Sequence, residues 1–244
     1  MRSAIVSAMK LLAFDTSTDQ LSIAIQHGDR TWEFQGAGGA QSSSTLIPAI
    51  QQGLQALGLT LQELQAIAFG RGPGSFTGLR TACSIAQGLA FGAGLPLLPV
   101  DTLLAVAEEA RHQHGCTEVL AVLDARMHEV YHAGYRYAPS AHGPHWEETH
   151  VLGLCAPQDL PAPAGLPVVG NAQAAYPAEL APAAQHLLAM PTASALLRLA
   201  PHLLHTGALV QAADALPRYI RDKVAQTTAE REAAKALAAT QPAA

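Results

Sequence analysis

The sequence has few cysteines, few charged residues and no long apolar run, and each of these absences excludes a class of protein. The three cysteines, Cys83, Cys116 and Cys155, are widely spaced and odd in number, so they predict neither a disulfide framework nor a CxxC zinc site. No apolar run reaches the roughly 18 residues that a membrane-spanning helix needs. Charged residues make up 14% of the 244 positions and the net charge is −5. This argues against a protein that grips a nucleic-acid backbone by itself, because such binding needs clustered Lys and Arg.

Apolar residues, by contrast, make up 49% of the chain, enough for one large domain or two small lobes. The first residues, MRSAIVSAMKLLAF, are only superficially like a signal peptide, because Lys10 interrupts the apolar stretch and no small-residue cleavage site follows it. We therefore expect a cytoplasmic protein that starts at Met1 or Met9, with residues 1–8 as a flexible extension.

The first half of the chain alternates between strand and helix patterns. Leu21, Ile23 and Ile25 alternate with small residues, which is typical of a strand, whereas Leu46 and Ile50 have helical spacing. The expected strands span residues 11–14, 21–25, 31–35, 66–69 and 95–100, and the expected helices span residues 42–57, 77–92 and 102–114.

The pattern then restarts, with Asp124 following an apolar strand as Asp15 does in the first half. This weak internal repeat predicts two stacked lobes that each contain a mixed sheet. We expect the lobes to span residues 9–114 and 115–225, with residues 226–244 as a flexible end. The expected elements of the second half are strands at residues 119–123, 129–135, 146–152 and 166–169 and a helix at residues 193–205.

A glycine-rich loop, GRGPGSFTG, joins the strand at residues 66–69 to the next helix. It lacks the Lys of a Walker phosphate loop, since Leu79 and Arg80 follow its last glycine, and Thr77 replaces the third glycine of the dinucleotide fingerprint. Two interpretations stay open. The loop either places an anion on the helix N-terminus near Thr77 and Gly78, or packs the helix tightly against the sheet.

The segment from His128 to His132 matches the HExxH motif of zinc proteases. On a helix the two histidines would face one metal and Glu129 would activate water. Here the alternating pattern around Val130 and Tyr131 predicts a strand, which places the two histidines about 13 Å apart at ~3.3 Å per residue. That separation is too large for one zinc ion, so we expect no metal site, and an HExxH metallopeptidase stays as an alternative.

Asp15 and Asp124 each follow a strand, the position at which sugar kinases and actin-like ATPases hold magnesium across a cleft. That chemistry needs glycine-rich turns in which backbone amides meet phosphate oxygens. The turn after Asp15 has hydroxyl groups but no glycine, and Arg126 follows Asp124 closely. We therefore predict vestigial nucleotide loops, with a sugar-kinase-like ATPase as a second alternative. The vestigial residues are Asp15, Thr16, Ser17, Thr18 and Asp124.

Six segments together resemble the TsaB (YeaZ) family: DTST, GRGPGSFTGLR with its helix, GLPLLPV, LDARMHEVY, GNA and LPRYIRDKVA. They occur in the family's order over residues 10–225. The resemblance implies an α/β, actin-like or Hsp70-like (ASKHA) fold of two lobes, each a mixed sheet flanked by helices. It also implies a non-catalytic dimerisation or scaffold subunit of the complex that makes threonylcarbamoyladenosine beside the tRNA anticodon. Such a subunit has no cofactor and no membrane contact, and it meets tRNA only indirectly.

The resemblance further implies pairing with the catalytic relative TsaD and the ATPase TsaE, with TsaD bound through the first two helices of the N-terminal lobe. The second of these helices carries small residues, which permit close packing against a partner or inside its own lobe. A homodimer through the same helices stays open. Ser42 to Ser44 replace the family's His-Ser-Glu run, so the metal-binding HxxxH of TsaD is not expected. The predicted partner-facing residues are Thr45, Ala49, Gly53, Ala56, Arg80, Cys83, Ser84 and Gln87.

Overall fold

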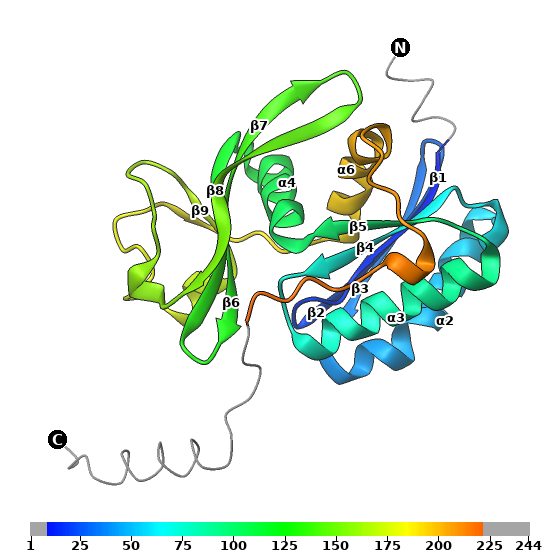
Figure 1. The fold of residues 1–244 in the computed structure, drawn as a ribbon, viewed down its shortest axis with the longest axis horizontal. Coiled ribbons are helices and arrows are strands. Elements are labelled where there is room, and N and C mark those ends of the chain that lie inside the picture. Colours follow the sequence, from blue (N-terminus) through cyan, green and yellow to red (C-terminus); the bar gives the residue numbers. More distant parts are fainter. Residues whose placement is uncertain (1–8, 222–244) are drawn as a thin grey trace, which may run out of the picture.

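The computed structural model describes residues 9–221, which form two mixed sheets of five strands each with helices on their faces (Figure 1). The predicted flexible ends, residues 1–8 and 226–244, lie outside the described residues. The strands are β1 (Lys10–Asp15), β2 (Gln20–His27), β3 (Arg30–Ala37), β4 (Ala66–Gly72), β5 (Leu97–Asp101), β6 (Glu118–Arg126), β7 (Glu129–Ser140), β8 (Gly143–Cys155), β9 (Val168–Gly170) and β10 (His186–Leu187). The helices are α2 (Ser42–Leu57), α3 (Phe76–Ala93), α4 (Thr102–His114), α5 (Ala172–Ala175) and α6 (Ala193–His205), with short 3-10 turns η1 (Gly39–Gln41), η2 (Leu61–Glu63), η3 (Pro157–Asp159) and η4 (Ala212–Asp214).

The first sheet has the strand order β3-β2-β1-β4-β5. Strands β1, β2 and β3 form an antiparallel meander, and β4 and β5 run parallel to β1 after helical crossovers. Successive side chains of β2 point to opposite faces of the sheet, and both faces are buried. Ile23 and Ile25 pack on one side, and Ala24 packs on the other. Because β1 and β4 are parallel neighbours, the loops at their carboxyl ends lie side by side.

The second sheet repeats this topology. Its order is β10-β9-β6-β7-β8, with an antiparallel meander of β6, β7 and β8 and with β9 and β10 parallel to β6. Asp124 near the end of β6 therefore corresponds to Asp15 at the end of β1. The internal repeat predicted from the sequence is confirmed at the level of strand order, and so is the α/β class with two mixed sheets.

The described residues stack in five layers (Figure 1). Helices α2 and α3 cover the outer face of the first sheet, α4 and α6 lie between the two sheets, and residues 160–184 cover the outer face of the second sheet. The central core contains Leu11 and Val100 of the first sheet together with Val119 and Tyr131 of the second. The two lobes therefore share one core through the pair α4 and α6.

A buried ion-pair network fixes α4 against α6. Glu108 is fully buried and accepts hydrogen bonds from Arg111, from Arg198 and from the Trp146 indole. Arg198 also pairs with Glu109. Since a buried carboxylate is costly without partners, these bonds hold α6 in place. The predicted boundary between residues 114 and 115 separates the two sheets, whereas α6 and the residues after it return to the first sheet.

The predicted bounds of α2, α4 and α6 agree with the structure, and the predicted strands are present with shifted ends. The short elements α5 and β10 were not predicted. Helix α2 begins at Ser42, and the side chain of the residue before it, Gln41, makes no capping hydrogen bond. Within residues 9–221, no helix combines the length and the apolarity needed to cross a membrane.

Candidate functional site

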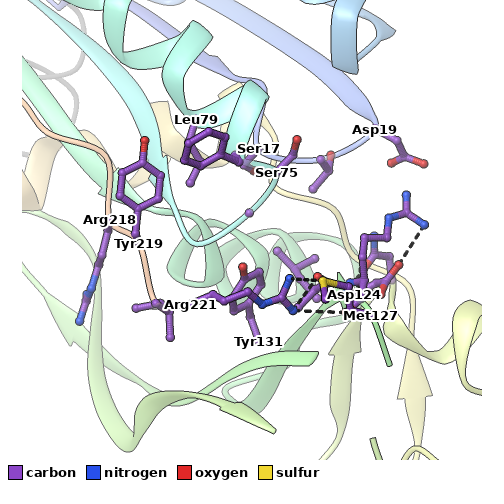
Figure 2. Close-up of a pocket in the computed structure, with 18 of the residues that line it drawn as sticks. Ser17, Asp19, Ser75, Leu79, Asp124, Met127, Tyr131, Arg218, Tyr219 and Arg221 are labelled. Atoms are coloured by element: carbon purple, nitrogen blue, oxygen red, sulfur yellow. Dashed lines mark hydrogen bonds and ion pairs between the residues drawn. The ribbon is translucent and has the colours of Figure 1, made fainter. Parts of the chain in front are cut away.

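A cleft of about 420 Å³ lies between the two lobes (Figure 2). Its walls come from the turn after β1, the loop before α3, the turn between β6 and β7, and the C-terminal residues 218–221. This is where the predicted nucleotide loops meet, so the repeat does bring them together. The side chains on these loops decide what the cleft can hold.

Asp15 ends β1 but does not line the cleft. It is 1% exposed; its Oδ1 accepts hydrogen bonds from the Ser17 amide at 2.8 Å and the Ser17 hydroxyl at 2.6 Å, while Oδ2 has no partner. Burial raises the pKa of Asp15 to about 6, against the lowering effect of the two Ser17 bonds. A Cβ on Gly70 would lie 1.7 Å from Oδ2, so this oxygen is pressed on the backbone of β4. The carboxylate is enclosed by protein and is not placed to hold a metal in the cleft.

The glycine-rich loop packs on the turn after β1. A Cβ on Gly78 would lie 1.9 Å from the carbonyl oxygen of Thr16, and one on Gly74 would lie 2.5 Å from that of Ser17. The Ser75 amide donates to the Ser17 carbonyl at 2.7 Å, and the Thr16 hydroxyl donates to the Gly78 carbonyl at 2.7 Å. Of the two interpretations of this loop, the geometry favours tight packing of the helix, because the Ser75 amide and the Gly78 carbonyl are hydrogen-bonded to the turn after β1.

Asp124 does line the cleft, but both of its oxygens are engaged. Oδ1 accepts hydrogen bonds from the Arg126 amide at 2.8 Å and the Tyr176 hydroxyl at 3.0 Å, and Oδ2 pairs with the Arg126 guanidinium at 3.1 Å. The turn that follows is strained. Arg126, Met127 and His128 have φ angles of 62°, 56° and 59°, a left-handed conformation that residues with a Cβ rarely adopt.

Residues 215–221, here called the C-terminal strap, cross the cleft from one lobe to the other (Figures 1 and 2). Arg218 pairs with Asp101 of the first sheet, and Arg221 pairs with Glu129 of the second. From the sequence, this segment was predicted only to carry the family likeness, and none of its residues was predicted to lie in the site. The Arg-Tyr-Ile-Arg run could have indicated a role for this segment, because it concentrates positive charge in a chain with few charged residues.

The HExxH segment does not form a helix. His128 lies in the turn and His132 on β7, as the alternating pattern predicted. His128 is partnered by Glu179, with Nε2 2.8 Å from the carboxylate, whereas His132 is buried and its Nδ1 has no partner. Burial lowers the pKa of His132, and the nearby His150 lowers it further. Among residues 9–221, no three His, Cys, Asp or Glu side chains are grouped so that they could hold a metal ion.

Helices α2 and α3, the predicted partner surface, lie alongside each other on the outside of the first sheet (Figure 1). Three of the predicted residues face inward instead. Ala49 and Gly53 are buried, and a Cβ on Gly53 would lie 2.4 Å from the Trp32 ring, because α2 lies close to β2 and β3. Cys83 is buried too, and its thiol donates to the carbonyl of Ala215. These three residues serve packing within the lobe.

The other predicted residues lie at or near the surface, and their role stays a prediction. Ala56, Arg80 and Ser84 are exposed, and Thr45 and Gln87 are half-buried. The largest apolar group on this surface is Phe91, which is 85% exposed and was not among the predicted residues. Ile47 on α2 and Gly88 and Gly92 on α3 are also exposed on this surface.

Three comparisons relate the chain to known proteins. Residues 38–151 match a family model described as TsaD: tRNA N6-adenosine threonylcarbamoyltransferase. The curated tRNA threonylcarbamoyladenosine biosynthesis protein TsaB of Haemophilus influenzae is 44% identical over 123 residues, and that of Escherichia coli is 40% identical over 144 residues. The two alignments cover 50% and 59% of this chain and 52% and 62% of the relatives. The chain thus spans between half and two thirds of the length of these two curated relatives.

A solved structure extends the likeness over more of the chain. YeaZ from Pseudomonas aeruginosa is 33% identical, with a TM-score of 0.79, and the alignment covers 86% of this chain and 99% of that protein. An uncharacterized protein from the same organism, with similarity to peptidase YEAZ, has the same identity and TM-score and is covered completely. At this coverage the shared fold includes both sheets.

Proposed function

The chain belongs to the TsaB (YeaZ) family, and from that membership we propose that it is a non-catalytic subunit of the system that makes threonylcarbamoyladenosine in tRNA. Its place of action is the cytoplasm, where tRNA is modified. It works by presenting a surface to a catalytic protein rather than by making or breaking a bond itself.

The observation that carries this proposal is that the predicted nucleotide loops at the cleft are engaged in contacts within the chain. One nucleotide-loop carboxylate, Asp15, is enclosed against β4, and the other, Asp124, is taken up by its own turn. The glycine-rich loop that would cradle phosphate packs on the turn after β1 instead. Phosphate binding in such a cleft requires backbone amides and a carboxylate that are free to meet the ligand. This arrangement supports a subunit without ATPase chemistry.

The proposed docking surface is the outward side of α2 and α3. Gly88 and Gly92 lie on α3 with open space where a Cβ would be, so another helix can approach its backbone closely. Phe91 between them offers a large apolar side chain of the kind that anchors interfaces. The partner is the threonylcarbamoyltransferase TsaD, and TsaE joins the pair. In the absence of TsaD the same surface forms a homodimer.

Contact with tRNA is indirect in this proposal. The chain has 14 basic and 19 acidic residues, and the arginines of the cleft are paired with acids: Arg218 with Asp101, Arg221 with Glu129, and Arg126 with Asp124. Paired cations release few counterions on binding a nucleic acid and so contribute little affinity. Binding of tRNA is left to the partner.

The test is depletion of the protein from its cell, followed by mass spectrometry of the nucleosides of total tRNA. We expect the level of threonylcarbamoyladenosine to fall and to be restored by the wild-type chain. Gly88→Arg should not restore it, because it places a charge on the docking surface, whereas Val151→Arg on the exposed side of β8 should. An unchanged level after depletion contradicts the proposal. Gly53→Arg is unsuitable, since Gly53 packs on Trp32 and the variant would disrupt the lobe.

A further inference from the structure

The C-terminal strap is anchored first on the lobe that carries the docking surface. The Arg218 amide donates to the Arg71 carbonyl at 2.6 Å, and the Arg218 guanidinium pairs with Asp101 at 2.7 Å. The Arg80 guanidinium donates to the Tyr219 hydroxyl at 3.2 Å. These contacts join backbone and side chains of the strap to β4, β5 and α3.

Two residues of α3 complete this anchor. Gln87 donates to the carbonyl of Ala215 at 3.0 Å, and the Tyr219 ring lies 5.4 Å from the ring of Phe76. Arg80 stacks over Phe76 at 3.8 Å, so the ring is held between the strap and the helix. Arg80 and Gln87 are also predicted partner-facing residues. The strap therefore reaches the edge of the proposed docking surface.

The other end of the strap holds the turn between β6 and β7. The Arg221 guanidinium donates to the carbonyl oxygens of Ala125 at 3.1 Å and Arg126 at 3.3 Å, and it pairs with Glu129. Figure 2 shows Arg221 directed toward Met127 and Asp124 across the cleft. A guanidinium is suited to this role because its fixed fork of donors meets several acceptors at once.

The held turn is the one with three successive left-handed residues, Arg126 to His128. Such a conformation persists only where the surrounding structure enforces it, because each residue with a Cβ is disfavoured there. Arg221 contacts the carbonyl groups at the start of this turn and the carboxylate just after it. Arg221 is the strap residue placed to enforce the conformation.

We infer that the strap is a latch that couples the α3 docking surface to the cleft: it holds the strained turn of the second lobe in place from anchors on α3. A partner that binds Arg80 or Gln87 changes the contacts of the strap, which is the segment that fixes residues 126–128. The latch itself rests on contacts within this chain, whereas its coupling to a partner rests on the proposed function.

Hydrogen–deuterium exchange of the full-length protein tests the latch. Arg221→Met should raise the exchange rate of amides in residues 123–130 about tenfold, since the loss of a charge-assisted anchor raises the equilibrium constant of local opening by roughly that factor. Arg221→Lys should give an intermediate rise, because a lysine reaches Glu129 but lacks the fork that meets the carbonyl groups as well. Exchange in β2 and β3 should not change.

Arg136→Met is the matched control. It removes an ion pair with Glu118 at 2.8 Å from β7 of the same sheet, away from the strap. Glu129→Gln weakens the same latch from the second lobe and covers the case in which Arg221→Met does not fold. Equal exchange of residues 123–130 in wild type, Arg221→Met and Glu129→Gln overturns the latch, and so does an equal rise in the control.

Affinity for the purified TsaD-type transferase tests the coupling. Arg221→Met should change the dissociation constant about fivefold or more, although Arg221 lies outside the docking surface, because coupled sites share their free energy. The same constant for wild type and Arg221→Met overturns the coupling. If the wild-type chain itself does not bind the transferase, the proposed function fails, while the exchange experiment still decides whether the latch exists.

Discussion

The turns after β1 and β6 occupy equivalent places in two sheets of the same topology, yet they are built in opposite ways. The first turn is buried and relaxed: Thr16 and Ser17 are 0% and 2% exposed, and a glycine loop packs directly on them. The second turn is strained and open, with Met127 55% exposed, and it is held from outside by Arg221. Equivalent topology has therefore preserved the position of the two turns but not their chemistry.

This difference bears on what the cleft does. The first turn contributes to packing between α3 and the sheet, and the second is the site at which the strap binds the second lobe. Each use engages groups that a nucleotide site would need to keep free, namely the carboxylates of Asp15 and Asp124 and the amide of Ser75. The first carboxylate is therefore unavailable to a ligand through burial, and the second through pairing within its own turn.

Breaking the first turn gives the largest expected effect. Gly78→Ala should lower the free energy of unfolding by about 3 kcal/mol, because its Cβ would lie 1.9 Å from the Thr16 carbonyl and the helix has to move. Gly88→Ala on the same helix is the control; it meets open space, so it should raise stability by about 1 kcal/mol. Urea denaturation measures both. A Gly78→Ala protein as stable as wild type contradicts the packing role of the loop.

The two aspartates sharpen the comparison, because their amide variants should differ in sign. The folded-state pKa of Asp15 is about 6, above the ordinary value of 3.8, because the carboxyl group is buried. The contribution of protonated Asp15 to the free energy of unfolding is therefore complete below pH 3.8, and it is lost as the pH rises through about 6. Asp15→Asn removes the cost of ionising a buried group and should raise stability at pH 8 by up to about 3 kcal/mol.

Asp124→Asn loses an ion pair and should lower stability by about 1 kcal/mol. The measurement is the difference in unfolding free energy between variant and wild type from pH 4.5 to pH 8. A difference for Asp15→Asn that does not grow with pH would contradict the burial of an ionisable carboxylate there.

Relieving the second turn should stabilise the protein. The double substitution Met127→Asn and His128→Gly supplies the residues that a left-handed hairpin turn prefers. We expect a gain of about 1 kcal/mol in unfolding free energy, since each left-handed residue with a Cβ costs about that much and the contact of His128 with Glu179 is lost. Thermal unfolding measures the gain. A loss of stability would show that the turn is not strained.

The smallest effect is expected at the tip of the β7–β8 hairpin. His142 stacks on His205 with ring centroids 3.5 Å apart, and His145 lies 4.3 Å from His202. Burial lowers the pKa of His202, and the neighbouring histidines lower it further. The contribution of neutral His202 to the free energy of unfolding is therefore complete above about pH 6.5, and it is lost as the pH falls through the lowered pKa. His202→Gln should flatten the dependence of the melting temperature on pH between 7.5 and 5.5, whereas the control His112→Gln should leave it as steep as in wild type.

The sequence was sufficient where local pattern decides structure. Helix α6 has the predicted bounds and strong apolar spacing, α4 has the predicted bounds and an alanine-rich face, and β7 was correctly separated from a zinc-protease helix by its alternation. Ala49 and Gly53 were assigned to the wrong side of α2, although Leu46, Ala49, Ile50, Gly53, Leu54 and Leu57 form one wide helical stripe that is buried throughout. The small residues in that stripe let the helix lie close to the sheet.

The strap illustrates what local pattern cannot decide. Gln87 and Ala215 are 128 positions apart in the chain, and Arg80 and Tyr219 are 139 apart. No periodicity links such segments, because their contact depends on how the chain returns after α6. The enclosure of Asp15 by β4 has the same origin, since it depends on the close approach of Gly70 across the sheet.

The most direct measurement is titration calorimetry of the purified chain with the TsaD-type transferase. We expect Gly88→Arg to weaken binding about 100-fold, because a charge at the centre of a helical interface is not solvated, and to leave the unfolding free energy within about 1 kcal/mol of wild type. Val151→Arg should bind as wild type does. Wild-type affinity in Gly88→Arg would contradict the central claim that this chain acts through the outward surface of α2 and α3.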